Sequence, residues 1–448
     1  MIRRTVREWQ RIGYGDDDAT IPETQADRLA AAARQSGFAG KSGTGVLDHG
    51  RKSLRAKGVV GVISAPGCQL EILPKIESGG ESEVADSVLR ERLIHMLAVV
   101  YDLPVESGPV AKLGWQRDTV LEILIRLFGR KLMDAVRRGM PRQYLEHQDE
   151  LPAMRGRLDI TRQFSRLAAS PQILACTFDD LSPDHALNQV MKAVVTKLSR
   201  LSQSPDTAKI LRELSFIYSD VTAVSAAALR WDRIVIDRTN ERWRDLLSFA
   251  RLFLTDRYQQ TQSGLVDGHA LLFEMNMLFE AYIARLLKRA LAGTGYRVAS
   301  QGGLRNCLYE GEKGRFQTRP DILVSQGRQI RLVIDTKWKR LFPQSQDPKL
   351  GISQSDVYQL MAYSQLYEAE QVMLLYPHHG GLQAGPEVRS YTIGSANADE
   401  RLNVATHDLT TPRENQRACI ARMMLGILDV GEDKVTLPPE MMSTAGVP

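Results

Sequence analysis

Two short acidic motifs lie near each other in the last third of the sequence. Pro320-Asp321 opens one apolar run, and Asp335-Thr336-Lys337 ends the next. Side chains alternate between the two faces of a strand, so Asp335 and Lys337 project together, about 7 Å apart. Carboxylates from neighbouring strands suit a hard Mg²⁺ or Mn²⁺ ion, and an ammonium group beside them suits an attacking water or a phosphate. The pattern predicts metal-assisted phosphodiester hydrolysis, with Asp321 and Asp335 as the metal ligands.

A salt bridge on an exposed strand would give the same Asp-x-Lys spacing. The flanking runs argue against it, because both are apolar enough to be central strands. Alternation predicts one face formed by Ile330, Leu332 and Ile334 and another formed by Val333, Asp335 and Lys337.

The pairing of the two aspartates depends on the turn between their strands. A two-residue turn at Gln326-Gly327 would pair Asp321 with residue 332. We therefore expect a turn centred near Arg328, or a β-bulge, if Asp321 and Asp335 are to lie opposite each other.

Two helices are expected to flank these strands. The first spans 271–291, and its apolar face predicts that Glu280 lies at the boundary between core and cleft, while Glu274 points further away. Glu280 is thus the preferred third acidic residue, with a solvated helix flank as the alternative. The second helix spans 356–368 and places Gln359 and Tyr363 on one face. These two residues either line the site or pack in the core.

The remaining pattern predicts three regions. We expect residues 1–160 to form a β-rich, mixed α+β N-terminal domain, residues 161–260 a mostly helical connection, and residues 261–448 an α/β domain. Within them we expect a hairpin at 59–76 with Pro66-Gly67 in a type II turn, and further elements as follows: helices at 85–101, 118–138 and 412–428, an extended stretch at 144–160, a largely helical stretch at 184–258, and strands at 319–324, 330–338, 372–376, 388–393 and 402–409.

Composition restricts the class of protein. Of 448 residues, 43% are hydrophobic and 25% are charged, which is the balance of a globular protein. No apolar run is long enough to span a membrane and the N-terminus is polar, so we expect a cytoplasmic protein without membrane contact. The four cysteines are widely spaced, which disfavours zinc sites and disulfides. The segment Gly40-Lys41-Ser42 mimics a P-loop, but Gln35 stands where that motif needs glycine. We therefore expect no nucleotide to bind to this chain.

The motif Pro-Asp followed by Asp-Thr-Lys resembles the PD-(D/E)XK nuclease superfamily. The whole chain also resembles the McrC subunit of McrBC-type modification-dependent restriction systems. That resemblance rests on these phrases: Leu70 to Lys75, Met154 to Asp159, Leu181 to Asp184 with Asn188, Asn276 to Tyr282, Pro320-Asp321, Asp335 to Lys337, and Gln359 to Tyr363.

The resemblance implies a restriction-endonuclease-like C-terminal domain and a Mg²⁺-dependent endonuclease subunit. Such a subunit would cut double-stranded, methylated DNA when a hexameric AAA+ GTPase recruits it, and it would stimulate that GTPase. Asp321 and Asp335 would hold the metal with the Thr336 carbonyl, Lys337 would orient the water, and Glu280 would assist.

The N-terminal region would then dock on the partner. Between Arg117 and Arg166 there are eleven Lys/Arg against seven Asp/Glu, so this stretch carries +4. Within it, Arg155 and Arg157 are the candidate docking residues. Two alternatives remain: a non-catalytic docking subunit that activates the AAA+ partner, and a stand-alone DNA-repair nuclease.

Overall fold

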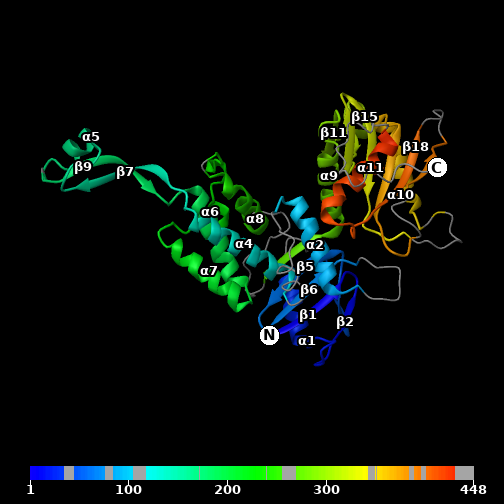
Figure 1. The fold of residues 1–448 in the computed structure, drawn as a ribbon, viewed down its shortest axis with the longest axis horizontal. Helices are drawn as coiled ribbons and strands as arrows, with labels where there is room; N and C mark the ends of the chain where they lie inside the picture. Colours follow the sequence, from blue (N-terminus) through cyan, green and yellow to red (C-terminus); the bar gives the residue numbers. More distant parts are fainter. Residues whose placement is uncertain are drawn as a thin grey trace. The chain divides into compact units, whose positions relative to one another are not determined.

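The computed structural model describes residues 1–34, 45–75, 84–103, 118–170, 172–238, 240–254, 269–341, 349, 351–382, 388–394 and 400–428. The P-loop-like segment at residues 40–42 lies outside these ranges. The chain forms two compact units (Figure 1). The first, the composite unit, joins Met1–Val120 to Gln260–Pro448, and the second, the inserted unit, is Leu121–Gln259. Residues 121–160, which we expected in the docking domain, thus belong to the helical inserted unit.

A four-stranded sheet forms the N-terminal part of the composite unit. Its order is β1-β6-β5-β10, with β1 parallel to β6 and the other neighbours antiparallel. The strands are β1 (Ile2–Arg7), β5 (Val59–Ala65), β6 (Cys68–Leu73) and β10 (His269–Glu274). The expected hairpin is confirmed as β5–β6, and Gly67 has the positive φ, 81°, that a type II turn requires. Helix α1 (Glu23–Arg34) and a small sheet of β2 (Arg11–Gly13), β4 (Ser53–Ala56) and β3 (Leu47–His49) complete this part.

Strand β10 corrects the expected helix at 271–291. Residues 269–274 pair with β5, and the helix, α9 (Met275–Ala290), begins only at Met275. The run Leu271-Leu272-Phe273 fits either structure locally, and the open edge of β5 decides between them. Gly61 on β5 makes the approach possible, because a Cβ there would lie 2.0 Å from the carbonyl oxygen of Leu271. The N-terminal sheet therefore crosses the expected domain boundary at residue 261.

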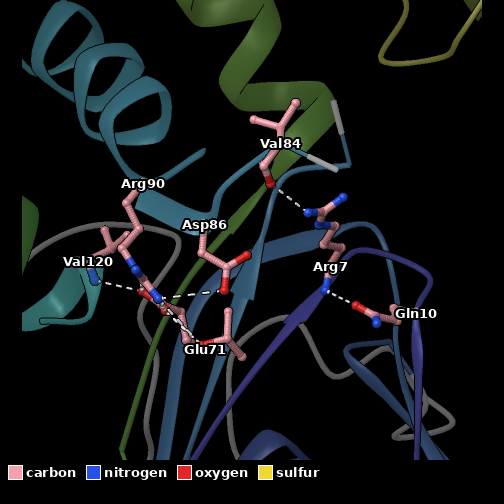
Figure 2. Close-up of polar contacts among 8 residues, drawn as sticks. Arg7, Gln10, Glu71, Val84, Asp86, Arg90 and Val120 are labelled. Carbon is pink, nitrogen blue, oxygen red and sulfur yellow. Dashed lines mark hydrogen bonds and ion pairs between the residues drawn. The ribbon is translucent and has the colours of Figure 1, made fainter. Parts of the chain in front are cut away.

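A buried ion pair joins this sheet to a helix of the composite unit (Figure 2). Glu71 of β6 is 1% exposed, and both of its oxygens lie within 3.2 Å of the guanidinium of Arg90. Arg90 belongs to α2 (Asp86–Val100). The backbone amide of Val120, where α4 (Val120–Arg137) begins, also donates to Glu71, at 2.9 Å. Removing one member of such a pair would leave a buried charge unpaired, at a cost of about 3–5 kcal/mol.

A six-stranded mixed sheet forms the C-terminal part of the composite unit. Its order is β11-β14-β15-β16-β18-β17, with β15, β16 and β18 parallel. The strands are β11 (Tyr296–Ser300), β14 (Ile322–Gln326), β15 (Gln329–Thr336), β16 (Gln371–Pro377), β17 (Val388–Thr392) and β18 (Arg401–His407). All five expected strands are confirmed, as are helices α10 (Gln354–Tyr367) and α11 (Arg413–Leu428). Strand β11 and the exposed hairpin β12 (Asn306–Glu310)–β13 (Lys313–Gln317) were not expected.

Helices cover this sheet and tie it to the N-terminal part. Helix α10 packs on one face through a cluster that includes Val333, Leu360 and Leu374. Helix α9 packs against α2 and α11. Within the described residues, no helix combines the length and apolar character that a membrane span requires.

The inserted unit consists of helices and a protruding β-arm. Its helices are α4, α6 (Ala186–Leu201), α7 (Pro205–Ile217) and α8 (Arg244–Leu254), which confirms the expected helices at 118–138 and 184–258. The arm contains β7 (Gln143–Leu151), β9 (Leu174–Ser182), β8 (Arg157–Leu158) and α5 (Ile160–Ser165). Seven of the nine residues of β7 are exposed and none is buried, so the arm has little core of its own.

Candidate active site

A β-bulge places Asp321 opposite Asp335. The turn between β14 and β15 is Gly327-Arg328, where Gln326 pairs with Gln329 and Gly327 has φ +62°. The register then shifts by one residue between Val324 and Ser325, so Ile322 pairs with Ile334. Asp321 precedes Ile322 and therefore lies next to Asp335. The sequence called for a turn near Arg328 or a bulge, and the structure contains both.

The bulge also corrects one expected face of β15. Ile330 packs with Val333 against the α10 cluster, not with Leu332 and Ile334. The extra residue, Arg331, changes the alternation, because a bulge shifts every side chain on one side of it to the other face.

Asp321 is held by the end of β15. Its Oδ2 accepts hydrogen bonds from the backbone amide of Thr336 at 2.8 Å and from the Thr336 hydroxyl at 2.9 Å. Burial raises the pKa of Asp321, and the Thr336 hydrogen bonds and the Lys337 charge oppose that rise. These bonds leave Oδ1 of the same carboxylate for another partner.

Asp335 and Lys337 form a close ion pair. The Lys337 Nζ lies 2.7 Å from Asp335 Oδ2, as the alternation of the strand predicts. Burial, followed by the Asp321 charge, raises the pKa of Asp335 to about 6 despite the nearby ammonium. Burial alone would lower the pKa of Lys337, but the neighbouring carboxylates raise it, so this lysine remains charged.

Asp356 is a site residue that the sequence analysis missed. It lies in the first turn of α10, 3.5 Å from Lys337 Nζ and 3.2 Å from Lys339 Nζ. Its only sequence signal is its place three residues after Ser353, a spacing typical of a helix start and not of an active site.

Glu280 approaches the same carboxylates from α9. Burial, followed by the Asp321 charge, raises its pKa to about 7, and Asp335 adds to the rise. Gln301 hydrogen-bonds to Glu280 and donates its backbone amide to the Asp321 carbonyl at 2.8 Å, so it connects the two acids. Glu274, the rejected candidate, ends β10 opposite Val59. Gln301 was not foreseen, because nothing in its local sequence marks it.

Gln359 and Tyr363 lie together on α10. The Gln359 amide donates to the Tyr363 hydroxyl at 2.9 Å. Burial raises the pKa of Tyr363, and the charges of Asp335 and Asp321 contribute to the rise, so the phenol faces the acidic site. Tyr363 is also 6% exposed and contacts the ring of Tyr367 edge-on. Its position thus combines the two roles, lining and packing, that the sequence left open.

The carboxylates are suited to a metal ion bound together with substrate and water. Within the described ranges, no three or more His, Cys, Asp or Glu side chains form a group that could hold a metal ion by themselves. Mg²⁺ is commonly bound by one or two carboxylates plus waters and substrate phosphates. Burial raises the pKa of both Asp321 and Asp335, and the charge of Asp321 adds to the rise for Asp335. Both carboxylates fit that arrangement, because a bound cation would favour their ionised form.

Arg155 and Arg157 lie elsewhere, on the arm of the inserted unit. Arg155 pairs with Asp180 at 3.0 Å and stacks over Phe178, with its Cζ 4.0 Å from the ring centre. Arg157 pairs with Glu146 at 2.9 Å and remains 74% exposed. Each arginine therefore makes a local contact and still presents its side chain to solvent.

Comparison with known proteins adds the family. The sequence model for the McrBC 5-methylcytosine restriction system component matches residues 54–377. The chain belongs to the McrBC family. No curated protein matches it.

Two solved structures share the fold. One is a refined half-complex from the tetradecameric assembly of Thermococcus gammatolerans McrB AAA+ hexamers with bound McrC. The matched chain is 21% identical with a TM-score of 0.67, and the match covers 94% of this chain and 100% of that one. The other is the cryo-EM structure of the Thermococcus gammatolerans McrBC complex, with 24% identity, a TM-score of 0.50, and coverage of 65% and 88%. The mixed architecture described above is thus an McrBC-family fold.

Proposed function

We propose that this McrBC-family chain is the DNA-cutting subunit of a restriction complex, with a PD-(D/E)XK endonuclease site in its C-terminal sheet. The observation that carries the proposal is the bulge that places Asp321 opposite Asp335, with Lys337 Nζ 2.7 Å from the latter. A scaffold has no need for a buried carboxylate, a half-buried carboxylate and an ammonium group at one strand end. Such a cluster lowers the stability of the fold, and its presence therefore favours a functional role.

Asp321 and Asp335 are the residues that would hold Mg²⁺ or Mn²⁺, with the Thr336 carbonyl as a further ligand. Such an ion, when bound, supplies a Lewis acid for the phosphate oxygens and lowers the pKa of a coordinated water. The hydrogen bonds from Thr336 fix the Asp321 carboxylate in one orientation. Asp356 lies on the other side of Lys337 and holds its ammonium group near Asp335.

Lys337 orients the attacking water and offsets the negative charge that develops on the phosphate in the transition state. Glu280, with a pKa near 7, can accept a proton from that water or carry one, because it exchanges protons readily at neutral pH. Gln359 and Tyr363 line the same side of the site and position the DNA backbone.

A AAA+ GTPase is the proposed partner, and the arm of the inserted unit is the proposed docking surface. Several large apolar side chains on the arm are exposed: Tyr144 73%, Met154 64%, Ile160 65%, Phe164 74% and Leu181 43%. A concentration of exposed apolar residues with arginines is typical of a protein interface. The first matched structure is a complex of Thermococcus gammatolerans McrB AAA+ hexamers with bound McrC, which supports the same kind of partner here.

The test is cleavage of methylated and unmethylated plasmid by the chain purified with a AAA+ subunit of the same genome. Asp335→Asn and Lys337→Ala should each lower cleavage about 100-fold or more and leave GTPase stimulation intact. The matched controls are Asp220→Asn and Lys288→Ala, exposed residues outside the site. Cleavage at the wild-type rate in both site variants would end the nuclease assignment. GTPase stimulation without any cleavage by the wild type would favour a non-catalytic docking subunit.

A further inference from the structure

Glu8 is a buried carboxylate at the end of β1 for which the proposed chemistry has no use. It is 1% exposed, and its backbone amide donates to the Leu73 carbonyl at 3.0 Å. Its Oε2 accepts the backbone amide of Lys75 at 3.0 Å, while Oε1 is buried without a hydrogen-bond partner among the described residues. Burying a carboxylate in this way is costly, so its retention calls for a purpose beyond the sheet.

A second hydrogen bond to the Glu8 carboxylate comes from the residue Trp338, which lies two positions after strand β15 of the C-terminal sheet. Trp338 Nε1 donates to the same Oε2 at 2.9 Å, across 330 residues of sequence. Trp338 directly follows Lys337, whose backbone amide is held by the Leu375 carbonyl of β16 at 2.9 Å. The backbone on either side of the proposed catalytic lysine is therefore anchored at two points, one in each sheet of the composite unit.

The indole of Trp338 also contacts the helix that carries Glu280. Its ring lies 5.3 Å, centre to centre, from that of Phe279, the neighbour of Glu280 on α9. A displaced indole would therefore disturb both sides of the site, the end of β15 and the middle of α9.

We propose that Glu8 and Trp338 are positioning residues, and that their hydrogen bond makes the geometry of Lys337 and Glu280 depend on the N-terminal sheet. The inference rests on the proposed nuclease function. Neither residue touches the reacting groups. A fixed indole holds the lysine and the glutamate in register, and a misplacement of about 1 Å at such a site can cost a hundredfold in rate.

The experiment measures cleavage kinetics of the full chain in complex with its AAA+ partner. Trp338→Phe keeps the ring against Phe279 but removes the donor, and Glu8→Ala removes the acceptor. Each should lower kcat for cleavage about tenfold or more, with KM for DNA and GTPase stimulation unchanged. Glu8→Gln keeps an acceptor oxygen and should stay within about threefold of wild type. The double variant should be no slower than the slower single variant, because both lose the same bond.

Trp9→Phe is the matched control, since Trp9 adjoins Glu8 but is 47% exposed, and it should cleave at the wild-type rate. Cleavage within twofold of wild type for Trp338→Phe would overturn the proposal, as would a Glu8→Gln variant as slow as Glu8→Ala. Should Glu8→Ala fail to fold, Trp338→Phe and Glu8→Gln still decide the question. Asp335→Asn, measured in parallel, separates failure of the nuclease assignment from failure of the positioning role. If Asp335→Asn still cuts DNA, the nuclease assignment fails. If Asp335→Asn is inactive while Trp338→Phe is fully active, only the positioning role of Glu8 and Trp338 fails.

Discussion

Asp321 and Thr336 are joined by two hydrogen bonds that end on one carboxylate oxygen, 2.8 Å from the backbone amide and 2.9 Å from the hydroxyl. The bonds orient the Asp321 carboxylate across the strand boundary and leave its other oxygen free to bind. The threonine between Asp335 and Lys337 thus orients a carboxylate that precedes the neighbouring strand.

Thr336→Val should test this arrangement, because valine keeps the shape of threonine and the backbone hydrogen bond but removes the hydroxyl. We expect about 10-fold to 100-fold weaker activation of cleavage by Mg²⁺, the usual effect of losing a group that orients a metal ligand. A metal titration of the cleavage rate measures it. Thr392→Val, at an exposed position of β17 in the same sheet, is the control and should leave the titration unchanged.

Metal removal should stop cleavage reversibly. The proposed ligands are oxygen atoms, and hard oxygen ligands favour Mg²⁺ and Mn²⁺. EDTA should abolish cutting, and added Mg²⁺ or Mn²⁺ should restore it while Zn²⁺ alone should not. Recovery with Zn²⁺ and without Mg²⁺ would contradict the ligand set.

Phe164→Ser should separate docking from folding on the arm. Phe164 is 74% exposed, so its replacement should change the melting temperature little, yet loss of an apolar anchor at an interface commonly costs 1 kcal/mol or more, about fivefold or more in affinity. The GTPase rate of the partner, titrated with the variant, measures this loss. Phe216→Ser is the control, since Phe216 is 81% exposed on α7 but lies outside the arm.

The arginines of the arm give a second route to the same surface. Arg157→Ala breaks an exposed pair with Glu146, which contributes at most about 1 kcal/mol to folding. Weaker GTPase stimulation with unchanged melting would support docking through Arg157. Lower melting with full stimulation would assign the arginine to a local contact alone.

Glu8 should make stability depend on pH. Burial raises its pKa from 4.5 to about 7, so between these pH values the folded protein holds a proton that the unfolded chain has lost. The carboxyl therefore destabilises the fold progressively as pH rises from 4.5 to 7, by about 3 kcal/mol at most. Glu8→Gln removes this effect. Its melting temperature relative to wild type should rise between pH 5 and pH 8, and an unchanged difference over that range would mean that the folded protein keeps the carboxyl ionised.

Local patterns in the sequence determined most elements of this chain. Alternation identified β14, β15 and the side on which Asp335 and Lys337 lie, because a strand fixes the direction of each side chain without reference to its neighbours. Pro66-Gly67 specified the β5–β6 turn for a similar reason, since only certain residues adopt its backbone angles. The choice of Glu280 over Glu274 followed from helical periodicity, which holds even though the helix begins later than expected.

Contacts between distant segments were decided only by the tertiary structure. Leu271 to Phe273 form a strand because β5 offers an unpaired edge, which no local pattern reveals. The sequence required a turn near Arg328 or a bulge, and the fold uses both, because strand register depends on how the sheet packs as a whole. Asp356, Gln301 and Glu8 have no motif of their own. Each acquires its place through a partner from 19 to 330 residues away, Lys337, Asp321 or Trp338, and chain folding alone brings such pairs within hydrogen-bonding or ion-pairing distance.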